Sequence, residues 1–262
     1  MIVPDLGMCW TTLKNSLKAA SLEWWFLTVA SLYLLVWWDH LRIDAGVMLL
    51  IGTSDGFPLR HNFWLESIGH DGARNLALIL LLGLWLAVIR APGWLSDFSR
   101  SERLFMALVT SLCAVGISLL KHYSVVSCPW DQAAFGGSAH WVPHWAWWVA
   151  TDGGPGGCFP GGHASSGFAF IAAAWPGLAS SADSRRWRWG WRILMLALVS
   201  GLALGVVQSL RGAHPPGHTL WTAWLCWTAS GLVYTAFAKA LPLAGAWRAS
   251  PQGSSAVGGD HG

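Results

Sequence analysis

Six long apolar runs are the feature of this sequence that most limits its fold. They cover residues 22–39, 73–90, 103–120, 164–181, 193–210 and 219–238. A helix needs about 20 residues to cross the hydrocarbon core of a bilayer, where every backbone polar group must be paired within the protein. Only 11% of the residues are charged, compared with about 25% in soluble domains. The sequence therefore predicts an all-α protein, a bundle of six transmembrane helices.

The remaining segments divide the chain into three parts. Residues 1–21 are expected to form a cytoplasmic N-terminal segment without a cleavable signal peptide, because they lack an apolar core. Residues 22–240 form the predicted membrane domain, and 241–262 a low-complexity tail. The run 45–51 is too short to span a bilayer and is expected to be interfacial or re-entrant. Pro176 is expected to kink or end the fourth apolar run.

Basic residues predict the orientation, because Lys and Arg are enriched in cytoplasmic loops. With the N-terminus inside, 11 of the 16 Lys and Arg residues fall on the inner side. The five on the outer side are Arg42, Arg60, Arg74, Lys121 and Arg211. The 21 Trp residues suit the membrane interface, whereas a net charge of +3 without a basic run excludes a nucleic-acid-binding protein. We expect a bacterial inner-membrane protein with both termini in the cytoplasm.

This topology places nine of the ten histidines on or near the outer face. They are His40, His61, His70, His122, His140, His144, His163, His214 and His218. The two longest loops, 40–72 and 121–163, also lie outside, so any chemistry is predicted at the outer membrane boundary. His140 and His144, which stand among tryptophans, are expected to be interfacial residues.

Three outer clusters supply the groups that phosphoryl transfer needs. The first is 121–131, beginning at Lys121; the second is the turn 160–163; and the third is 208–218. Lys121 and Arg211 can neutralise phosphate oxygens, and the N–H groups of Gly161 and Gly162 can add to that cradle. One histidine can attack phosphorus while another protonates the leaving oxygen.

Two cysteines, Cys128 and Cys158, lie in the same outer segment. In an oxidising compartment such as the periplasm they are predicted to form a disulfide.

At these residues the sequence resembles the type 2 phosphatidic acid phosphatase superfamily, which includes the vanadium haloperoxidases. That family has the motifs Lys-x6-Arg-Pro, Pro-Ser-Gly-His and Ser-Arg-x5-His-x3-Asp, and the resemblance covers about residues 100–240. The matching residues are Lys121, Pro129, Pro160, Gly162, His163 and His214. The resemblance implies six helices with the site facing outward, His214 as nucleophile and His163 as general acid.

The sequence departs from the family pattern at four positions. Cys128 and Gln208 stand where the family has arginines, Gly161 where it has serine, and His218 where it has aspartate. Arg211 lies three residues after Gln208, about one helical turn, so we expect it to restore a phosphate contact. Asp131 or His218 is expected to orient His214 in place of the missing aspartate. A bacterial subgroup with CPWD, CFP-x-GHAS and RGAH-x3-HTLW sequences resembles this chain, which favours a working enzyme.

The sequence thus predicts a lipid phosphatase that uses a phosphohistidine intermediate and neither a metal nor another cofactor. A His214–His218 metal pair is disfavoured, because Pro215 and Pro216 interrupt a regular helix between them. Expected substrates are the phosphates of a phospholipid, an isoprenoid lipid or lipid A. The sequence names neither the lipid nor the oligomeric state.

Three alternatives remain open at this stage. A lipid phosphotransferase would use the same intermediate but pass the phosphoryl group to a second lipid. A non-catalytic lipid-binding or scaffold protein would keep the fold without the chemistry, consistent with the departures from the motifs. A redox protein is suggested only by the abundance of His and Trp, and its haem ligands would be expected inside helices.

Overall fold

The computed structural model describes the backbone of residues 6–145 and 151–249 as a bundle of helices. No β-strand occurs within these two ranges. The long helices are α1 (Leu6–His40), α3 (Ala73–Ile89), α4 (Arg100–His122), α7 (Arg185–Leu210) and α8 (Pro216–Ala249). The shorter helices are α2 (Ile43–Ile51), α5 (Ser165–Phe168) and α6 (Ile171–Leu178). A π-helical segment, η1 (Trp64–Gly72), leads into α3, and single 3₁₀ turns form η2 (Gly93–Asp97), η3 (Pro129–Asp131) and η4 (Ala133–Phe135).

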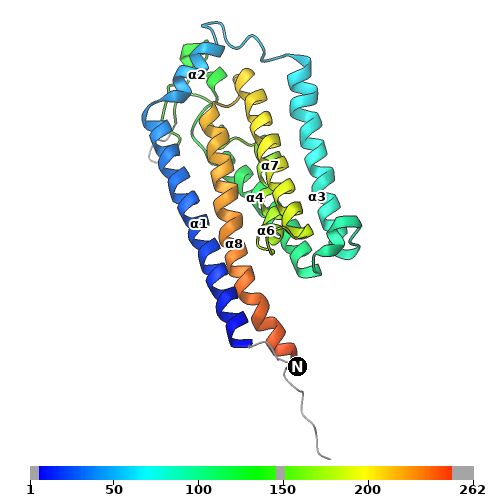
Figure 1. The fold of residues 1–262 in the computed structure, drawn as a ribbon. Helices are drawn as coiled ribbons and strands as arrows, with labels where there is room; N and C mark the ends of the chain where they lie inside the picture. Colours follow the sequence, from blue (N-terminus) through cyan, green and yellow to red (C-terminus); the bar gives the residue numbers. More distant parts are fainter. Residues whose placement is uncertain (1–5, 146–150, 250–262) are drawn as a thin grey trace, which may run out of the picture.

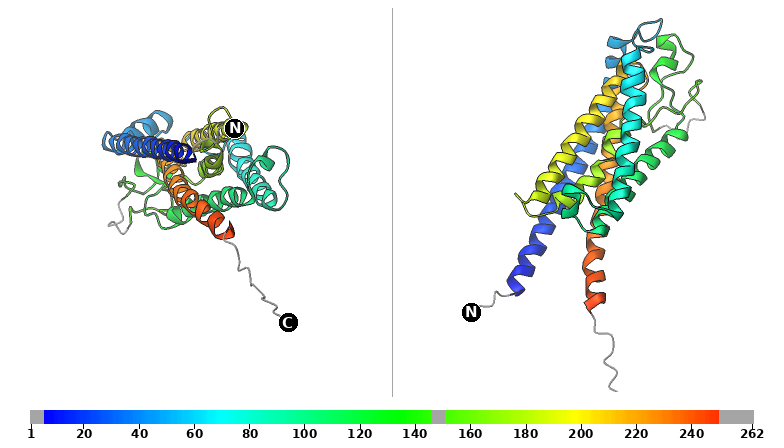
Figure 2. Two further views of the ribbon diagram at one scale, coloured as in Figure 1. Left: turned by 60° about the horizontal axis from the view of Figure 1, so that its bottom comes forward. Right: turned by 90° about the vertical axis from the view of Figure 1, so that its right-hand side faces the viewer.

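Successive long segments run alternately up and down the bundle (Figure 1). The short helix α2 lies at one end, which we call the α2 end, together with the loop that follows α4 (Figure 2). The first turn of α1 and the last turn of α8 lie at the opposite end. The two long loops predicted to share one face of the protein are therefore on the same end of the bundle.

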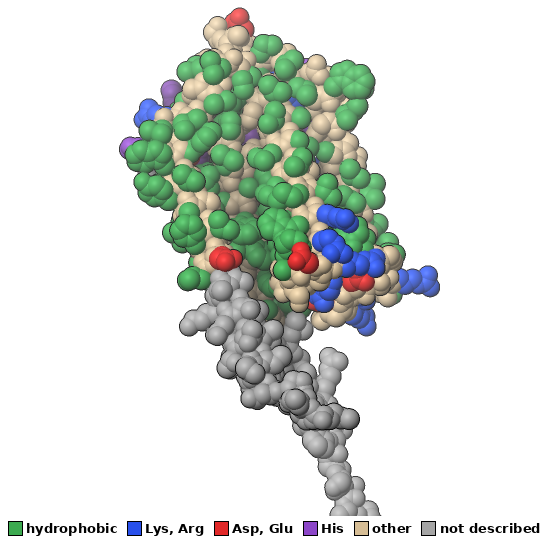
Figure 3. All heavy atoms as spheres, viewed as in Figure 1, with side chains coloured by type: hydrophobic (Ala, Val, Ile, Leu, Met, Phe, Trp, Pro, Cys, Tyr) green, Lys and Arg blue, Asp and Glu red, His purple; other side chains and the backbone are tan. Residues whose placement is uncertain are grey.

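Among the residues that the structure describes, three helices are long and apolar enough to cross a membrane: Trp64–Ile89, Arg100–His122 and Arg185–Leu210. Their sides carry exposed Leu, Ile and Val residues, as expected for surfaces that face lipid. Hydrophobic side chains cover the helix surfaces in Figure 3, and Lys and Arg gather toward the end away from α2. The chain has the features of a membrane protein.

The fourth apolar run is interrupted before Pro176, the residue that was expected to kink or end it. It is divided into α5 and α6, and Pro176 lies inside the second of them. Its small residues allow its backbone to approach the backbone of α7 closely. A Cβ added to Gly167 would lie only 2.3 Å from the Gly201 nitrogen. This packing against α7 is a tertiary contact, which hydropathy alone does not reveal. Phe168 and Ile171 join α4, α7 and α8 in the main apolar core.

Replacing Gly167 by alanine should destabilise the protein, because the added methyl group has no space between α5 and α7. We expect a loss of about 1–3 kcal/mol in the free energy of unfolding, seen as a lower melting temperature in detergent. The matched control is Gly83→Ala on α3, where the added Cβ would meet no atom within 4 Å. That variant should melt at or above the wild-type temperature, and equal destabilisation of both variants would contradict this account of the α5–α7 contact.

Candidate active site

The three clusters identified in the sequence meet in space. A Cβ on Gly162 would lie 3.3 Å from Lys121 Cδ and 3.6 Å from its Nζ, so the glycine turn touches the lysine at the end of α4. The Gly161 N–H donates to the His218 carbonyl oxygen at 3.2 Å, which ties the turn to the start of α8. Of the two predicted backbone donors, the Gly161 N–H is therefore engaged within the protein, and Gly162 is the one that faces Lys121.

His163 lies at the centre of a group of positive charges. Burial lowers its pKa to about 3, and the charges of His70, Lys121, Arg211 and Arg74 act in the same direction. The His163 ring lies 3.6 Å from the His70 ring between centroids, and its Nδ1 is buried without a hydrogen-bond partner. His163 is therefore neutral near pH 7. A bound anion would offset the surrounding charges and raise this pKa.

Arg211 belongs to this group and is only 5% exposed. Its Nη2 lies 3.1 Å from Glu66 Oε1, and its Nε donates to the Arg60 carbonyl oxygen at 3.1 Å. Glu66 is half-exposed, so a phosphate can take its place against the guanidinium without leaving the carboxylate buried. Arg211, the residue expected to restore a phosphate contact, thus already binds a carboxylate.

Gln208 occupies the position of one missing family arginine and is 1% exposed. Its backbone carbonyl accepts the N–H groups of Ala213 at 2.9 Å and His214 at 3.3 Å. Its side-chain Nε2 is buried and has no hydrogen-bond partner. Gln208 thus shapes the turn that holds His214, while the positive charge near the site comes from other residues.

His214 is 3% exposed and lies between two polar neighbours. Its Nδ1 is 3.3 Å from Cys158 Sγ and 3.4 Å from His218 Nδ1. Burial and the charges of Lys121 and His163 hold its pKa well below the usual range, and a backbone hydrogen bond to Cys158 partly opposes this shift. His214 is therefore a neutral imidazole, the form that a nucleophile requires.

The long loop after α4, which lies beside His214, is held in place by a disulfide and by hydrogen bonds. A disulfide joins Cys128 to Cys158. The buried carboxylate of Asp152 accepts the Ser127 N–H at 2.6 Å and the Ser127 hydroxyl at 2.7 Å. Asp131 packs through its backbone, whose carbonyl accepts the Ala139 N–H at 2.8 Å. Within the described part of the chain, His218 rather than Asp131 is the candidate orienting residue that contacts His214.

Sequence reasoning missed two residues of the site, His70 and Arg74. They come from η1 and α3, in the half of the chain outside the motifs. Their spacing of four residues places them on one helical face, and the predicted topology puts both outside. The shared helical face and the predicted outer location were the sequence features that could have identified both residues.

His144 also differs from its expected role at the membrane interface. Its Nδ1 lies 3.1 Å from His218 Nε2, and its Nε2 lies 3.2 Å from Asp39 Oδ1. His144 thus connects His218, which contacts His214, to the Asp39 carboxylate on α1. His144 is therefore part of a buried polar network rather than a membrane anchor.

Arg74→Ala should weaken substrate binding, because the exposed guanidinium adds charge beside His163. We expect KM to rise about tenfold at low ionic strength and less in high salt, which screens exposed charges. The comparison variant is Arg90→Ala, which removes an exposed arginine just after the far end of α3. An unchanged KM for Arg74→Ala, or equal effects of both variants, would exclude Arg74 from the anion site.

Within the described ranges, two groups of residues have donor atoms arranged as metal ligands. In the first, Cys128 and Cys158 lie near His214, but their sulfur atoms are joined in the disulfide and are not thiolates. The second contains Asp39, Asp44 and His144 and lines a cavity of about 540 Å³. None of the residues that line this cavity belongs to the cationic group around His163.

The arrangement around His163 and His214 combines two neutral imidazoles with a set of lysine and arginine side chains. Such a site can bind a phosphate group, attack phosphorus and move a proton to the leaving oxygen. No protein-family model matches this chain, and no curated protein or solved structure matches it either.

Proposed function

We propose that this protein is a membrane lipid phosphatase that works through a phosphohistidine on His214. The observation that carries the proposal is the convergence of the motif segments: Gly162 lies against Lys121, and Gly161 is hydrogen-bonded to His218, which contacts His214. The charges of Lys121, Arg211 and Arg74 act on His163 in the same region. A group of cations beside a neutral nucleophile is what a dianionic phosphate ester would require. Resemblance to the three motifs of the phosphatase superfamily supports the same reaction.

In the first step the cations bind the non-bridging oxygens of the phosphate and bring phosphorus to His214. A ring nitrogen of His214 forms a bond to phosphorus as the bond between phosphorus and the lipid oxygen breaks. His163 gives its proton to that oxygen, so the lipid leaves as an alcohol. The lysine and arginine charges stabilise the transferring group, and this step uses no metal ion.

In the second step water replaces the lipid. His163, now neutral, removes a proton from the water as its oxygen attacks phosphorus. The bond between phosphorus and His214 breaks, and inorganic phosphate leaves with His214 restored. Each turnover thus returns both histidines to their starting protonation states.

A lipid substrate follows from the apolar surface of the bundle, because a lipid tail can remain in the bilayer while its phosphate enters the site. We propose a phosphomonoester or diphosphate headgroup in the outer leaflet of a bacterial inner membrane. In this arrangement six segments span the bilayer: α1, α3 with η1, α4, α5 with α6, α7, and α8. Both termini lie in the cytoplasm, and the α2 end faces the periplasm.

The pKa of His163 predicts how the reaction depends on pH. With a pKa of about 3, free His163 is a neutral imidazole with a single N–H at pH 5–8, and a phosphate ester loses its second proton near pH 6. The productive complex needs His163 in its doubly protonated, cationic form, so the additional proton must come from the monoanionic ester or from solvent during binding. We expect kcat/KM to be level below about pH 6 and to fall about tenfold per pH unit above it. Initial rates at low substrate concentration test this, and a level profile up to about pH 8 would contradict it.

The proposal is tested by measuring phosphate release from defined lipids by the full-length protein in detergent. The panel contains phosphatidic acid, phosphatidylglycerol phosphate, undecaprenyl diphosphate and a lipid A phosphate. We expect release from at least one lipid, and none from the double variant His163→Ala/His214→Ala. His140→Ala, which removes an exposed histidine, should keep the wild-type rate.

Failure to release phosphate from any lipid would contradict hydrolysis. The same reactions would then be repeated with unlabelled acceptor lipids and a labelled phosphate donor. Label in the acceptor would identify a phosphotransferase, and its absence would support a non-catalytic protein.

A further inference from the structure

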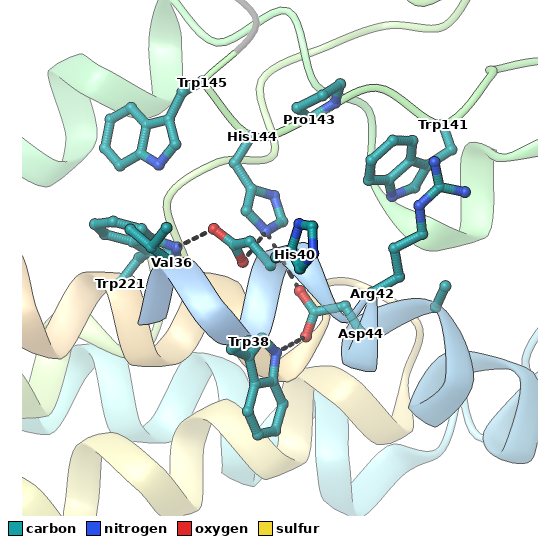
Figure 4. A pocket seen from close by; sticks show the side chains of 12 residues that line it. Val36, Trp38, His40, Arg42, Asp44, Trp141, Pro143, His144, Trp145 and Trp221 are labelled. Carbon is teal, nitrogen blue, oxygen red and sulfur yellow. Dashed lines mark hydrogen bonds and ion pairs between the residues drawn. The ribbon is translucent and has the colours of Figure 1, made fainter. Parts of the chain in front are cut away.

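A cavity of about 540 Å³ lies beside the turn between α1 and α2. Its lining includes Asp39, Asp44 and His144, with Trp38, Trp141 and Trp221 around them. Figure 4 shows His144 reaching down from its loop toward Asp44, with Trp38 on the other side of that carboxylate. These residues belong to a different part of the protein from the cations around His163.

Three atoms in this cavity have the spacing of metal ligands. His144 Nε2 lies 3.2 Å from Asp39 Oδ1 and 3.4 Å from Asp44 Oδ2, and all three atoms lie within 4.8 Å of one another. In a tetrahedral zinc site, bonds of about 2.0–2.1 Å place neighbouring ligand atoms about 3.3–3.4 Å apart. The contacts made by His144 match this separation.

The other polar atoms of these side chains are held by the surrounding protein. Asp44 Oδ1 accepts the Trp38 indole N–H at 2.8 Å and the Gly217 backbone N–H at 2.7 Å. Asp39 Oδ2 accepts the Trp221 indole N–H at 2.9 Å. His144 Nδ1 lies 3.1 Å from His218 Nε2. Metal-binding carboxylates and histidines are typically fixed in this way, with one atom on the metal and the other on a protein partner.

The Oδ2 atom of Asp44 has a single long contact for a buried carboxylate oxygen. The residue is only 8% exposed, and Oδ2 makes no hydrogen bond within normal geometry beyond its ion pair with His144 Nε2 at 3.4 Å. This oxygen is one of the three clustered donor atoms. A cation bound there would satisfy it, and two carboxylates would balance a charge of +2.

We propose that Asp39, Asp44 and His144 bind a divalent transition-metal ion, with zinc the best match. One nitrogen and two carboxylate oxygens suit zinc, whereas magnesium and calcium favour sites made only of oxygen. The fourth coordination position faces the cavity and is open to water. Arg42 also lines the cavity, but its guanidinium lies 4.8 Å from the Trp141 ring centroid and is stacked on it.

The ion would act on the active site by positioning side chains rather than by touching substrate. With Nε2 on the metal, His144 carries its proton on Nδ1 and donates it to His218 Nε2. His218 then carries its own proton on Nδ1, which lies 3.1 Å from the Cys158 carbonyl oxygen and 3.4 Å from His214 Nδ1. Metal binding would thus fix the tautomer of the histidine next to the proposed nucleophile. This consequence rests on the proposed function, whereas the metal site itself does not.

The proposal is tested by the metal content of the full-length protein, purified in detergent without chelators from cells grown with zinc. We expect one zinc ion per chain. After exchange with Co²⁺, we expect the intense visible absorption of a four-coordinate ion, without the charge-transfer band of a cobalt–thiolate bond. Asp44→Asn and His144→Gln should lose both signals, whereas Asp55→Asn and His61→Gln, which alter exposed residues outside the cavity lining, should keep them.

Several results would overturn the proposal. Wild-type protein without stoichiometric metal would show that a proton occupies the site instead, consistent with a His144 pKa that its two carboxylate partners raise to about 9 despite burial. Retention of metal by both ligand variants would place the ion elsewhere. If the variants fail to fold, the wild-type content and cobalt spectrum still decide the question. These readouts are independent of phosphatase activity, so failure of the proposed function would leave them unchanged.

Discussion

Replacing His214 by alanine is expected to lower phosphate release by about 10⁴-fold or more, because the variant lacks the atom proposed to bond to phosphorus. The neutral state of this imidazole and its position beside Lys121 and His163 are the reasons for assigning it this role. The measurement is kcat on the preferred lipid in detergent, with the enzyme concentration raised until residual turnover can be quantified. KM should change little, since His214 makes its new bond only as the reaction proceeds.

The control for this variant is a measurement of whether it remains folded. His214 is buried, so its loss leaves a cavity and is expected to reduce stability. A melting curve shows whether the variant remains folded at the assay temperature. His214→Gln keeps more of the side-chain volume and should be as inactive as the alanine variant. Substantial turnover by either folded variant would exclude His214 as the nucleophile.

His163→Ala is expected to lower kcat by about 10²–10⁴-fold on a lipid phosphate, because the leaving alkoxide then receives no proton from the enzyme. The loss should be much smaller on a nitrophenyl phosphate ester, whose leaving group is stable without a proton. The measurement is the ratio of wild-type to variant kcat on the two substrates. This ratio separates a general acid from a residue that only holds the site together.

Equal losses on both substrates would contradict a general-acid role for His163 and indicate a structural one. The comparison also controls for misfolding, since a misfolded variant loses both activities together. His70→Ala is a useful companion, because it removes the ring that lies against His163 while leaving the proposed acid in place. It should reduce both activities by similar factors.

Hydropathy predicted the class of the fold but not all of its helix boundaries. The apolar run 103–120 lies within α4, and 45–51 lies within the short helix α2. The first run was predicted to begin at residue 22, whereas α1 begins at Leu6, because the polar segment before it is rich in helix-forming Leu, Lys and Ala. Likewise, α8 continues through Ala249, beyond residue 238, where the sixth apolar run was predicted to end.

The candidate site was predictable where its residues follow short motifs. Lys121, the glycine turn and His214 are separated in sequence yet meet in the structure. The contributions of His70, Arg74 and His144 come from other segments, and only the three-dimensional packing brings them close to the motif residues. A motif describes one segment at a time and contains no information on such partners.

The most direct test of the central claim is to trap the proposed phosphoenzyme. The full-length protein is mixed with lipid carrying ³²P in its phosphate, and the reaction is stopped in alkali within one turnover. We predict label on the wild-type chain that is stable in base and lost in acid, as expected for phosphohistidine, and that maps to the peptide containing His214. His214→Ala should carry no label. Wild-type protein that releases phosphate without any covalent label would show direct transfer to water and contradict the account.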